Sequence, residues 1–242
     1  MADTPDPVGT ESSGTELGGT EPRGLEPIAD EPASLPLRSS ERVYEGRVWD
    51  LRRDVFELGG APVLREYVDH PGAVAVLALD EADRVFLIRQ YRHPVRTREW
   101  EIPAGLLDVT GEDPLAAASR ELAEEGDLAA AEWAVLADFF TSPGGSDEAI
   151  RIYLARGLSA TPEAFAREDE EAHMETRWTP LDECVDAVLA RRVQNPSLTI
   201  GVLAAHASRS RGWSTLAAAD APWPGRSTPR NAPRPREEPT RR

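Results

Sequence analysis

The sequence predicts a fold of the α/β (or α+β) class, in which helices cover both faces of a mixed sheet and further antiparallel strands come before it. Three observations lead to this prediction. Strand-like runs occur on both sides of a helical segment at residues 114–125, and two more helical segments follow near the end of the chain. The composition is that of a globular protein only between the two termini. Because sheets and helices each bury an apolar side, this order of elements predicts a layered sandwich.

The strands expected before the central helix are short apolar runs. Val43–Leu58 contains two stretches in which apolar and polar residues alternate, and Val63–Val68 continues the alternation. Such alternation is typical of half-buried antiparallel strands. Ala73–Leu79 and Val85–Tyr91 are richer in β-forming residues, and Asp80–Asp83 between them has the composition of a hairpin turn. We therefore expect N-terminal antiparallel strands over residues 43–69, followed by two further strands that flank a turn.

A second group of elements is expected after the central helix. Trp133–Phe140 and Ala149–Ala155 have the pattern of strands, with a Pro-Gly-Gly loop between them. A short strand over Met174–Trp178 then leads into two helical stretches, Pro180–Arg192 and Pro196–His206.

Length, charge and composition exclude several classes of protein. At 242 residues the chain has room for one domain with a sizeable core and loose ends. Its net charge of −16 opposes general binding to a nucleic-acid backbone, which needs a basic face. All 27 basic residues are arginine, so no lysine is present for a Walker-type phosphate loop or for Schiff-base chemistry. The single cysteine, Cys184, excludes an internal disulfide and a cysteine zinc cluster.

The two ends of the chain differ from the middle. Residues 1–40 are rich in Gly, Pro, Ser and Thr and carry 8 acidic and 2 basic side chains, and residues 213–242 are rich in Pro and Arg. Such segments bury too little apolar surface to offset the entropy lost on ordering. We expect disordered tails around one domain over residues 41–212, and solvated tails are preferred to tails that bind RNA, a membrane or an acidic partner. We expect no membrane span and no secretory signal, and hence a cytoplasmic protein.

The central helix has clear start signals. Asp113 is a good N-cap, and Pro114 suits the first helical position, where its missing N–H costs nothing. Leu115, Ala118 and Leu122 recur at i, i+3 and i+7 and mark the face that packs inward.

Three glutamates share another side of this helix. Glu121, Glu124 and Glu125 are spaced i, i+3 and i+4, which places them on one arc. Like charges at this spacing destabilise a helix by roughly 0.2–0.5 kcal/mol per pair. A divalent cation reverses that effect, because Mg²⁺ binds a few carboxylates together with water and substrate phosphate. For the three glutamates alone a solvated acidic face is the preferred interpretation, and the surrounding residues change it.

The residues around the helix form a longer pattern. It runs Gly105, six residues, Glu112, seven residues, Arg120-Glu121, two residues, Glu124-Glu125. This pattern, over residues 105–128, resembles the Nudix box, whose first gap normally holds five residues. The glycine that follows the last two glutamates of the box falls on Asp127 here, with Gly126 one place early. Asp tolerates a left-handed backbone better than most residues, so the helix can still end there. The resemblance implies a Nudix-type α/β/α sandwich.

Motifs outside the box are more specific. Gln90-Tyr91-Arg92, Trp100-Glu101-Ile102-Pro103-Ala104-Gly105 and Ser142–Glu148 look like the ADP-ribose pyrophosphatase branch of the family, and the similarity covers residues 43–210. The resemblance implies a homodimer whose N-terminal strands cross between subunits. It also implies Mg²⁺-dependent hydrolysis of a nucleoside diphosphate substrate, ADP-ribose, to AMP and ribose 5-phosphate.

The resemblance also assigns residues to the metal. It implies that the Ala104 carbonyl, Glu121 and Glu125 bind Mg²⁺, with Mn²⁺ as the alternative ion. Glu124 holds a further ion or its water, and Arg120 pairs with the glutamates of the box and orients them. A salt bridge on the helix surface is the alternative for Arg120.

The resemblance also implies a set of substrate-binding residues. Arg92 is expected to face a phosphate, because the planar guanidinium donates two bonds at once, and Arg98 assists it. Glu101 is expected at the terminal ribose or at a metal-bound water. Trp49 is the candidate for stacking on the adenine at a dimer interface. Gly145 and Ser146, at the end of the Pro-Gly-Gly loop and directly after it, are also expected to bind the substrate. A surface arginine and a core or interface tryptophan are the alternatives for Arg92 and Trp49.

The general base is expected in a late acidic loop. Residues 167–174 offer several carboxylates, of which Glu171 is closest to the strand near Met174 and is preferred, with Glu170 second and Glu168 behind them. The alternative is a solvated acidic loop.

Two other functions stay open for the chain, namely hydrolysis of another nucleoside diphosphate derivative and non-catalytic sensing of ADP-ribose.

Overall fold

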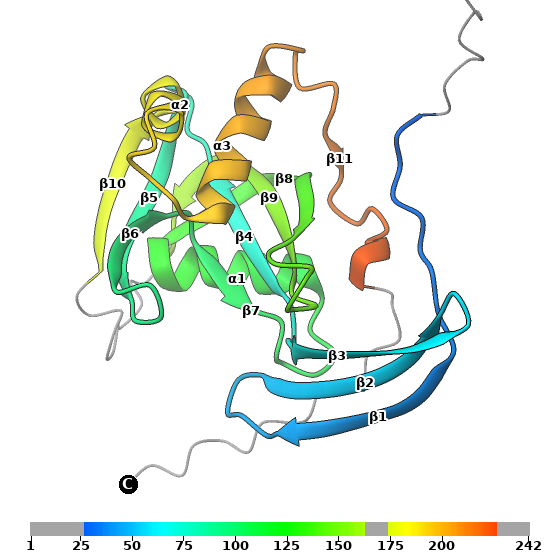
Figure 1. Ribbon diagram of the computed structural model, residues 1–242. Coiled ribbons are helices and arrows are strands. Elements are labelled where there is room, and N and C mark those ends of the chain that lie inside the picture. Colours follow the sequence, from blue (N-terminus) through cyan, green and yellow to red (C-terminus); the bar gives the residue numbers. More distant parts are fainter. Residues whose placement is uncertain (1–26, 163–173, 227–242) are drawn as a thin grey trace, which may run out of the picture. The chain divides into compact units, whose positions relative to one another are not determined.

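Three antiparallel strands form a separate sheet at the beginning of the domain. The computed structural model describes residues 27–162 and 174–226, and every element below lies in the compact unit that begins at Ser34 (Figure 1). The first sheet has the order β1 (Leu37–Tyr44), β2 (Asp50–Leu58), β3 (Ala61–Asp69). Gly59 and Gly60 join β2 to β3 with positive φ angles of 60° and 81°, which a two-residue hairpin turn requires. The prediction of antiparallel N-terminal strands is confirmed.

A mixed five-stranded sheet forms the centre of the fold. Its order is β11-β8-β9-β4-β7, and β4 and β9 run parallel while the other neighbours are antiparallel. The members are β4 (Ala73–Ala78), β7 (Ala104–Leu106), β8 (Leu128–Phe140), β9 (Ala149–Ala160) and β11 (Ala217–Ala218). All six residues of β4 are buried, which explains why its sequence is a continuous apolar run and does not alternate.

A third sheet, of order β10-β5-β6, lies beside the central one. It consists of β5 (Arg84–Arg92), β6 (Thr97–Glu101) and β10 (Glu175–Pro180), all antiparallel. This sheet brings the motif at Gln90–Arg92 next to the motif that begins at Trp100, because Arg89 pairs with Trp100 and Gln90 with Glu99.

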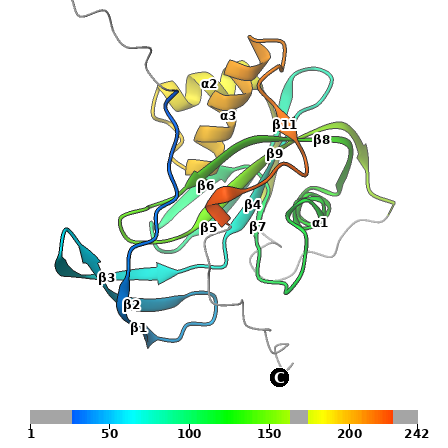
Figure 2. The ribbon, with the colours of Figure 1, turned by 90° about the vertical axis from the view of Figure 1, so that its right-hand side faces the viewer.

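Helices cover both faces of this strand layer. Figure 2 shows α1 (Pro114–Gly126) on one side, and α2 (Leu181–Leu189) and α3 (Pro196–Arg209) on the other. Side chains of β4 point alternately to the two faces of the sheet. Val74 and Val76 pack with Leu122 of α1, while Leu77 packs with Leu198 of α3. The α/β/α sandwich with a mixed sheet is therefore as predicted. Among the described helices, none is long and apolar enough to cross a membrane.

The ends of α1 follow the local sequence signals. The Asp113 side chain accepts hydrogen bonds from the backbone N–H groups of Leu115 and Ala116. At the other end Asp127 takes the left-handed conformation, with φ 52° and ψ 32°. Asp127 thus makes the helix exit that glycine makes in the box pattern.

The folded region extends past both expected boundaries. The strand β1 begins at Leu37, four residues before the expected start at 41, and residues 213–226 lie on the domain beyond the expected end at 212. Trp223 is buried there, and the buried Arg151 donates hydrogen bonds to the carbonyls of Ala221 and Pro222. The Pro/Arg-rich stretch that begins near Pro222 led to the expectation of a tail, and no local sign in the sequence indicated that Trp223 is buried or that Arg151 binds these carbonyls. The short 3-10 helix η2 (Pro224–Arg226) follows.

Candidate active site

The three glutamates of α1 differ in their surroundings. Glu125 is buried, and its Oε2 accepts a hydrogen bond of 2.9 Å from the backbone N–H of Ala104 in β7. Glu121 and Glu124 are partly exposed. One helix face therefore presents one fixed carboxylate and two that are accessible from solvent, all beside the strand that carries Ala104.

Arg120 connects the carboxylates of the box. Its guanidinium donates two hydrogen bonds to Glu112, of 3.0 and 3.1 Å, one to Glu121 of 2.7 Å and one to Glu124 of 3.0 Å. The hydrogen bonds to Glu112 are the largest cause of a raised pKa at Arg120, which the charge of Glu121 raises further. Arg120 thus neutralises part of the repulsion among these carboxylates. The expectation that it orients them for the reaction stays a prediction.

Gly105 makes room for Glu121. A Cβ atom built on Gly105 would overlap the carboxyl group of Glu121, including its Oε1, Cδ and Cγ atoms. A side chain at residue 105 would therefore displace a glutamate that lies sixteen residues further along the chain. This contact gives the first glycine of the box pattern a steric function.

Glu101 forms the second acidic centre of the site. It lies at the end of β6, is 2% exposed, and binds Arg92 of β5 through two hydrogen bonds of 2.8 and 2.7 Å. The side-chain amide of Gln90 lies 3.4 Å from the same carboxylate. These hydrogen bonds to Glu101 are the largest cause of a raised pKa at Arg92, and the negative charge of Glu125 also contributes. The Arg92–Glu101 pair is therefore electrostatically coupled to the helix of the box.

The other expected substrate residues lie at different places. Arg98 of β6 is an exposed side chain that reaches Glu175 at 4.0 Å. Trp49 is exposed in the connection between β1 and β2, in a different sheet from the box. Gly145 and Ser146 belong to the loop before β9, and the Gly145 carbonyl accepts a hydrogen bond of 2.9 Å from the N–H of Val68.

The candidates for the general base are not placed. Glu168, Glu170 and Glu171 all lie outside the described residues. Their assignment stays a prediction.

Glu112 is one of the glutamates of the box, so its pairing with Arg120 is among the pairs expected. A contact of the Pro-Gly-Gly motif, in contrast, was not predicted. The backbone N–H of His70 donates a hydrogen bond of 2.8 Å to Asp147, and the His70 ring lies 3.5 Å from Glu148. No local pattern links residues 77 positions apart, so this contact of the Pro-Gly-Gly motif could not be read from spacing.

The donor set suits a hard divalent cation. Carboxylate and carbonyl oxygens are the ligands that Mg²⁺ prefers in proteins. In the described parts of the chain, no three or more His, Cys, Asp or Glu side chains are already grouped so as to hold an ion. The Arg120 guanidinium binds Glu121 and Glu124 at 2.7 and 3.0 Å, so an oxygen of each carboxylate is engaged by this cation.

The fold and these residues indicate a class of chemistry. A helix rich in carboxylates on one face of an α/β/α sandwich, beside a buried Arg–Glu pair, has the oxygen ligands and the cationic group that metal-assisted reactions of phosphate compounds use. The comparison with family models identifies the family. The NUDIX domain model matches residues 69–198, and the chain belongs to the Nudix family and is a Nudix hydrolase.

Individual relatives cover most of the chain. A protein of Mycobacterium tuberculosis (strain ATCC 25618 / H37Rv), named ADP-ribose pyrophosphatase, is 45% identical over 193 residues, which are 78% of this chain and 91% of the relative. A protein of Bacillus methanolicus, named methanol dehydrogenase activator, is 39% identical over 164 residues, or 67% and 88%. Among solved structures, the crystal structure of an ADP compounds hydrolase matches with a TM-score of 0.62 at 19% identity, over 76% of this chain and 99% of that one. The similarity to this solved structure supports the fold of the chain alone.

Proposed function

We propose that this Nudix hydrolase splits the pyrophosphate bond of ADP-ribose, giving AMP and ribose 5-phosphate, with Mg²⁺ as the metal and Mn²⁺ as an alternative. The observation that carries the proposal is the convergence of Glu125, Glu121 and the Arg92–Glu101 pair around the strand of Ala104. The similarity to the ADP-ribose pyrophosphatase of Mycobacterium tuberculosis, at 45% identity, supports this choice of substrate.

The metal is assigned to oxygens of the box. The Ala104 carbonyl, Glu121 and Glu125 would hold it, with Glu124 available for a further ion. When bound, such an ion neutralises the diphosphate and lowers the pKa of a coordinated water. The fixed position of Glu125 supports this role, because its bond to the Ala104 N–H orients the carboxylate beside the strand that supplies the carbonyl. Arg120 can release Glu121 and Glu124 and keep two bonds to Glu112.

The substrate is assigned to groups around this centre. The two bonds from Arg92 to Glu101 use Nε and Nη2, so Nη1 is left outside the pair and can face a phosphate oxygen. Glu101 holds Arg92 in place and is proposed at the terminal ribose or a metal-bound water. Arg98, Gly145 and Ser146 are proposed as further contacts at the rim.

Dimerisation completes the proposed site. Trp49 is 43% exposed and lies in the connection between β1 and β2 of the N-terminal sheet, where Tyr44 and Leu64 are also exposed apolar side chains. We propose that this sheet packs against a second copy and that Trp49 stacks on the adenine in that assembly. A cytoplasmic location is part of the same proposal and agrees with the single cysteine.

The first experiment is an incubation of the purified full chain with ADP-ribose and Mg²⁺, with and without a chelator. Equimolar AMP and ribose 5-phosphate that disappear with the chelator are the expected result. Glu125→Gln should abolish product formation, whereas Glu132→Gln, an exposed change on β8, is the matched control and should retain it. Normal turnover by Glu125→Gln would contradict the metal assignment.

The general base has its own test. We propose that Glu171, with Glu170 as the second candidate, accepts the proton of the attacking water. Glu171→Gln should lower kcat by a factor of about 10²–10⁴, the usual contribution of a general base, with KM almost unchanged. If Glu171→Gln is fully active and Glu170→Gln is not, the assignment moves to Glu170.

The substrate panel separates the remaining alternatives. Nucleoside diphosphate sugars and dinucleotides should be cut with lower kcat/KM than ADP-ribose. Binding of ADP-ribose without any product would favour a sensor. Two departures from the box are the reasons for that alternative, namely its irregular end and the extra residue between Gly105 and Glu112. At the irregular end, Asp127 takes the left-handed conformation that ends the helix.

A further inference from the structure

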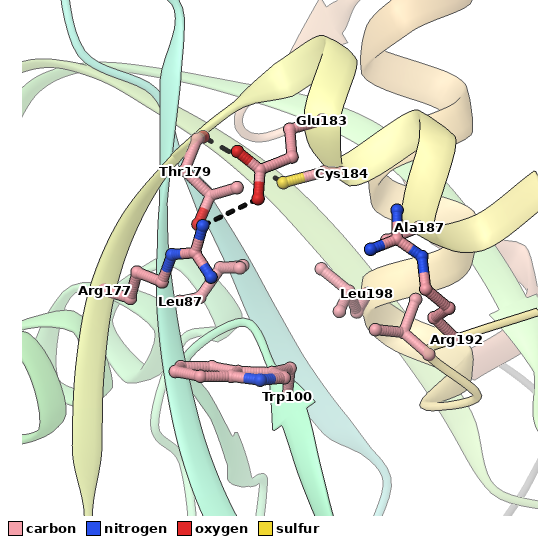
Figure 3. Close-up of a pocket in the computed structure, with 10 residues that line it drawn as sticks. Leu87, Trp100, Arg177, Thr179, Glu183, Cys184, Ala187, Arg192 and Leu198 are labelled. Atoms are coloured by element: carbon pink, nitrogen blue, oxygen red, sulfur yellow. Dashed lines mark hydrogen bonds and ion pairs between the residues drawn. The ribbon is translucent and has the colours of Figure 1, made fainter. Parts of the chain in front are cut away.

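A cavity of about 190 Å³ lies beneath α2, away from the glutamates of the box (Figure 3). The sheet of β5, β6 and β10 forms one wall, and α2 with the segment after it forms the other. Leu87 and Trp100 of this wall pack with the cluster under α2 and α3. Their chain neighbour Ile88 packs in the cluster of α1, and Glu101 binds Arg92 on that same side. The cavity is therefore a separate site on the opposite face of the sheet.

Thr179 brings an unsatisfied polar atom to this cavity. The residue is 4% exposed, and its Oγ1 has no hydrogen-bond partner in the described part of the structure. Figure 3 shows its side chain reaching from β10 into the space above Trp100. Buried hydroxyl groups are nearly always paired, because an unpaired one loses its hydration without compensation. A bound molecule with a hydroxyl group would satisfy it.

Arg192 supplies a free positive charge at the same cavity. Two arginines line it, but Arg177 donates a 2.6 Å hydrogen bond to Glu183 and its charge is shared. The Arg192 side chain, in the segment after α2, has no partner among the described residues, and Figure 3 shows it on the wall facing Arg177. An arginine without a partner at a cavity is suited to bind the oxygens of a phosphate.

Trp100 gives the cavity a flat apolar floor. Its indole lies across the lower side of the space in Figure 3, below Thr179 and Arg177. A sugar ring has C–H groups on its face and hydroxyl groups at its edge, which match an indole floor and a threonine wall. The volume is below the roughly 300–1,000 Å³ of sites for drug-sized ligands, so the cavity suits a small molecule.

We propose that this cavity binds a small sugar monophosphate, with the ring on Trp100, a hydroxyl at Thr179 and the phosphate at Arg192. The site is independent of the metal and of the hydrolytic reaction. Its occupant is of the size of a pentose phosphate.

Calorimetric titration of the full chain with ribose 5-phosphate tests the proposal. The titration is run with a chelator present, so that the proposed metal-dependent site does not contribute. Saturable binding is expected, about tenfold weaker for Arg192→Gln and threefold to tenfold weaker for Thr179→Val. Arg191→Gln is the matched control, because it removes the neighbouring charge without lining the cavity, and it should bind as the wild type does. Thermal unfolding of each variant shows that it is folded.

Three results would overturn the proposal. The first is an absence of binding at millimolar ribose 5-phosphate. The second is binding that Glu125→Gln weakens and Arg192→Gln does not, because this would place the ligand at the hydrolase site. The third is inorganic phosphate or AMP binding as tightly as ribose 5-phosphate, because neither matches a sugar-sized cavity with an indole floor.

Discussion

Arg92 holds the buried carboxylate of Glu101 with two hydrogen bonds, from Nε at 2.8 Å and from Nη2 at 2.7 Å. The resemblance assigned these two residues to different parts of the substrate, and the structure joins them. Glu101 is 2% exposed, so its charge depends on this partner, whereas the Arg92 side chain is 44% exposed and reaches the surface of the site. The pair is therefore fixed at its buried end, where Glu101 lies. At its exposed end the Nη1 group of Arg92 lies outside the pair.

Replacing Arg92 by alanine should destabilise the protein. The change leaves a buried carboxylate without its cation, and breaking such a pair costs about 2–4 kcal/mol when one partner is half exposed. The free energy of unfolding from urea titration measures this. Arg98→Ala, which removes an exposed arginine of the neighbouring strand, should change it by less than about 0.5 kcal/mol. Equal stability of the two variants would show that Glu101 does not need Arg92.

Gly105→Ala should impair the reaction more than the fold. The added methyl group overlaps the Glu121 carboxyl group, which is the flexible end of its side chain and moves away. The melting temperature should fall by a few degrees only, while kcat/KM for ADP-ribose falls by about 10²-fold or more, because a proposed metal ligand is displaced. A variant with wild-type kcat/KM would mean that Glu121 keeps its function in another rotamer.

Local features of the site were predictable from the sequence, and distant contacts were not. Asp113 and Asp127 cap α1 as expected, since caps depend on residues within one turn. The pairing of Arg92 with Glu101 depends on the register of β5 against β6, and β6 itself carries no apolar alternation that would have revealed it. Arg151 and Trp223 meet across 72 positions, and the composition around Trp223 indicates a tail. The fold class could be predicted from the apolar and polar patterns of the sequence. The Arg92–Glu101 and Arg151–Trp223 contacts could not, because they depend on which strands and segments the fold places side by side.

Ending the chain at the expected boundary, residue 212, should destabilise the domain. A chain that ends at residue 212 loses Trp223 and leaves the buried Arg151 without its two carbonyl acceptors, although Asp138 still binds it at 2.8 Å. We expect a loss of about 3 kcal/mol or more in the free energy of unfolding. A chain that ends at Arg226 keeps all of these contacts and is the control. If the two truncated chains unfold at the same urea concentration, residues 213–226 do not stabilise the domain.

Cys184 should resist alkylation in the folded protein. Burial, followed by the negative charge of Glu183, raises the pKa of this thiol to about 11, so at pH 8 less than about one part in a hundred is thiolate. Reaction with iodoacetamide at pH 8 should be at least about 100-fold slower than in the urea-unfolded chain, as followed by intact mass. The chain has one cysteine, so the added mass reports on this site alone. Rapid labelling of the folded protein would show that the wall of the cavity opens.

Arg120→Gln should bind a divalent cation more tightly while it turns over substrate more slowly. In the structure the Arg120 guanidinium competes with any cation for Glu121 and Glu124, at 2.7 and 3.0 Å. Removing this charge leaves the carboxylates repelling one another, and a cation relieves that repulsion. At a partly exposed site the gain is about 1 kcal/mol, or roughly fivefold in Kd.

Calorimetric titration of the substrate-free chain with Mn²⁺ measures this effect without any turnover. Glu121→Gln should weaken binding by about tenfold or more, because it removes a proposed ligand, and Arg98→Gln should leave the affinity unchanged. In a separate assay the kcat of Arg120→Gln should fall, because Glu112, Glu121 and Glu124 lose the group that orients them. If Arg120→Gln instead weakens Mn²⁺ binding, the guanidinium prepares the carboxylates for the ion, and the competition inferred from these hydrogen bonds does not exist.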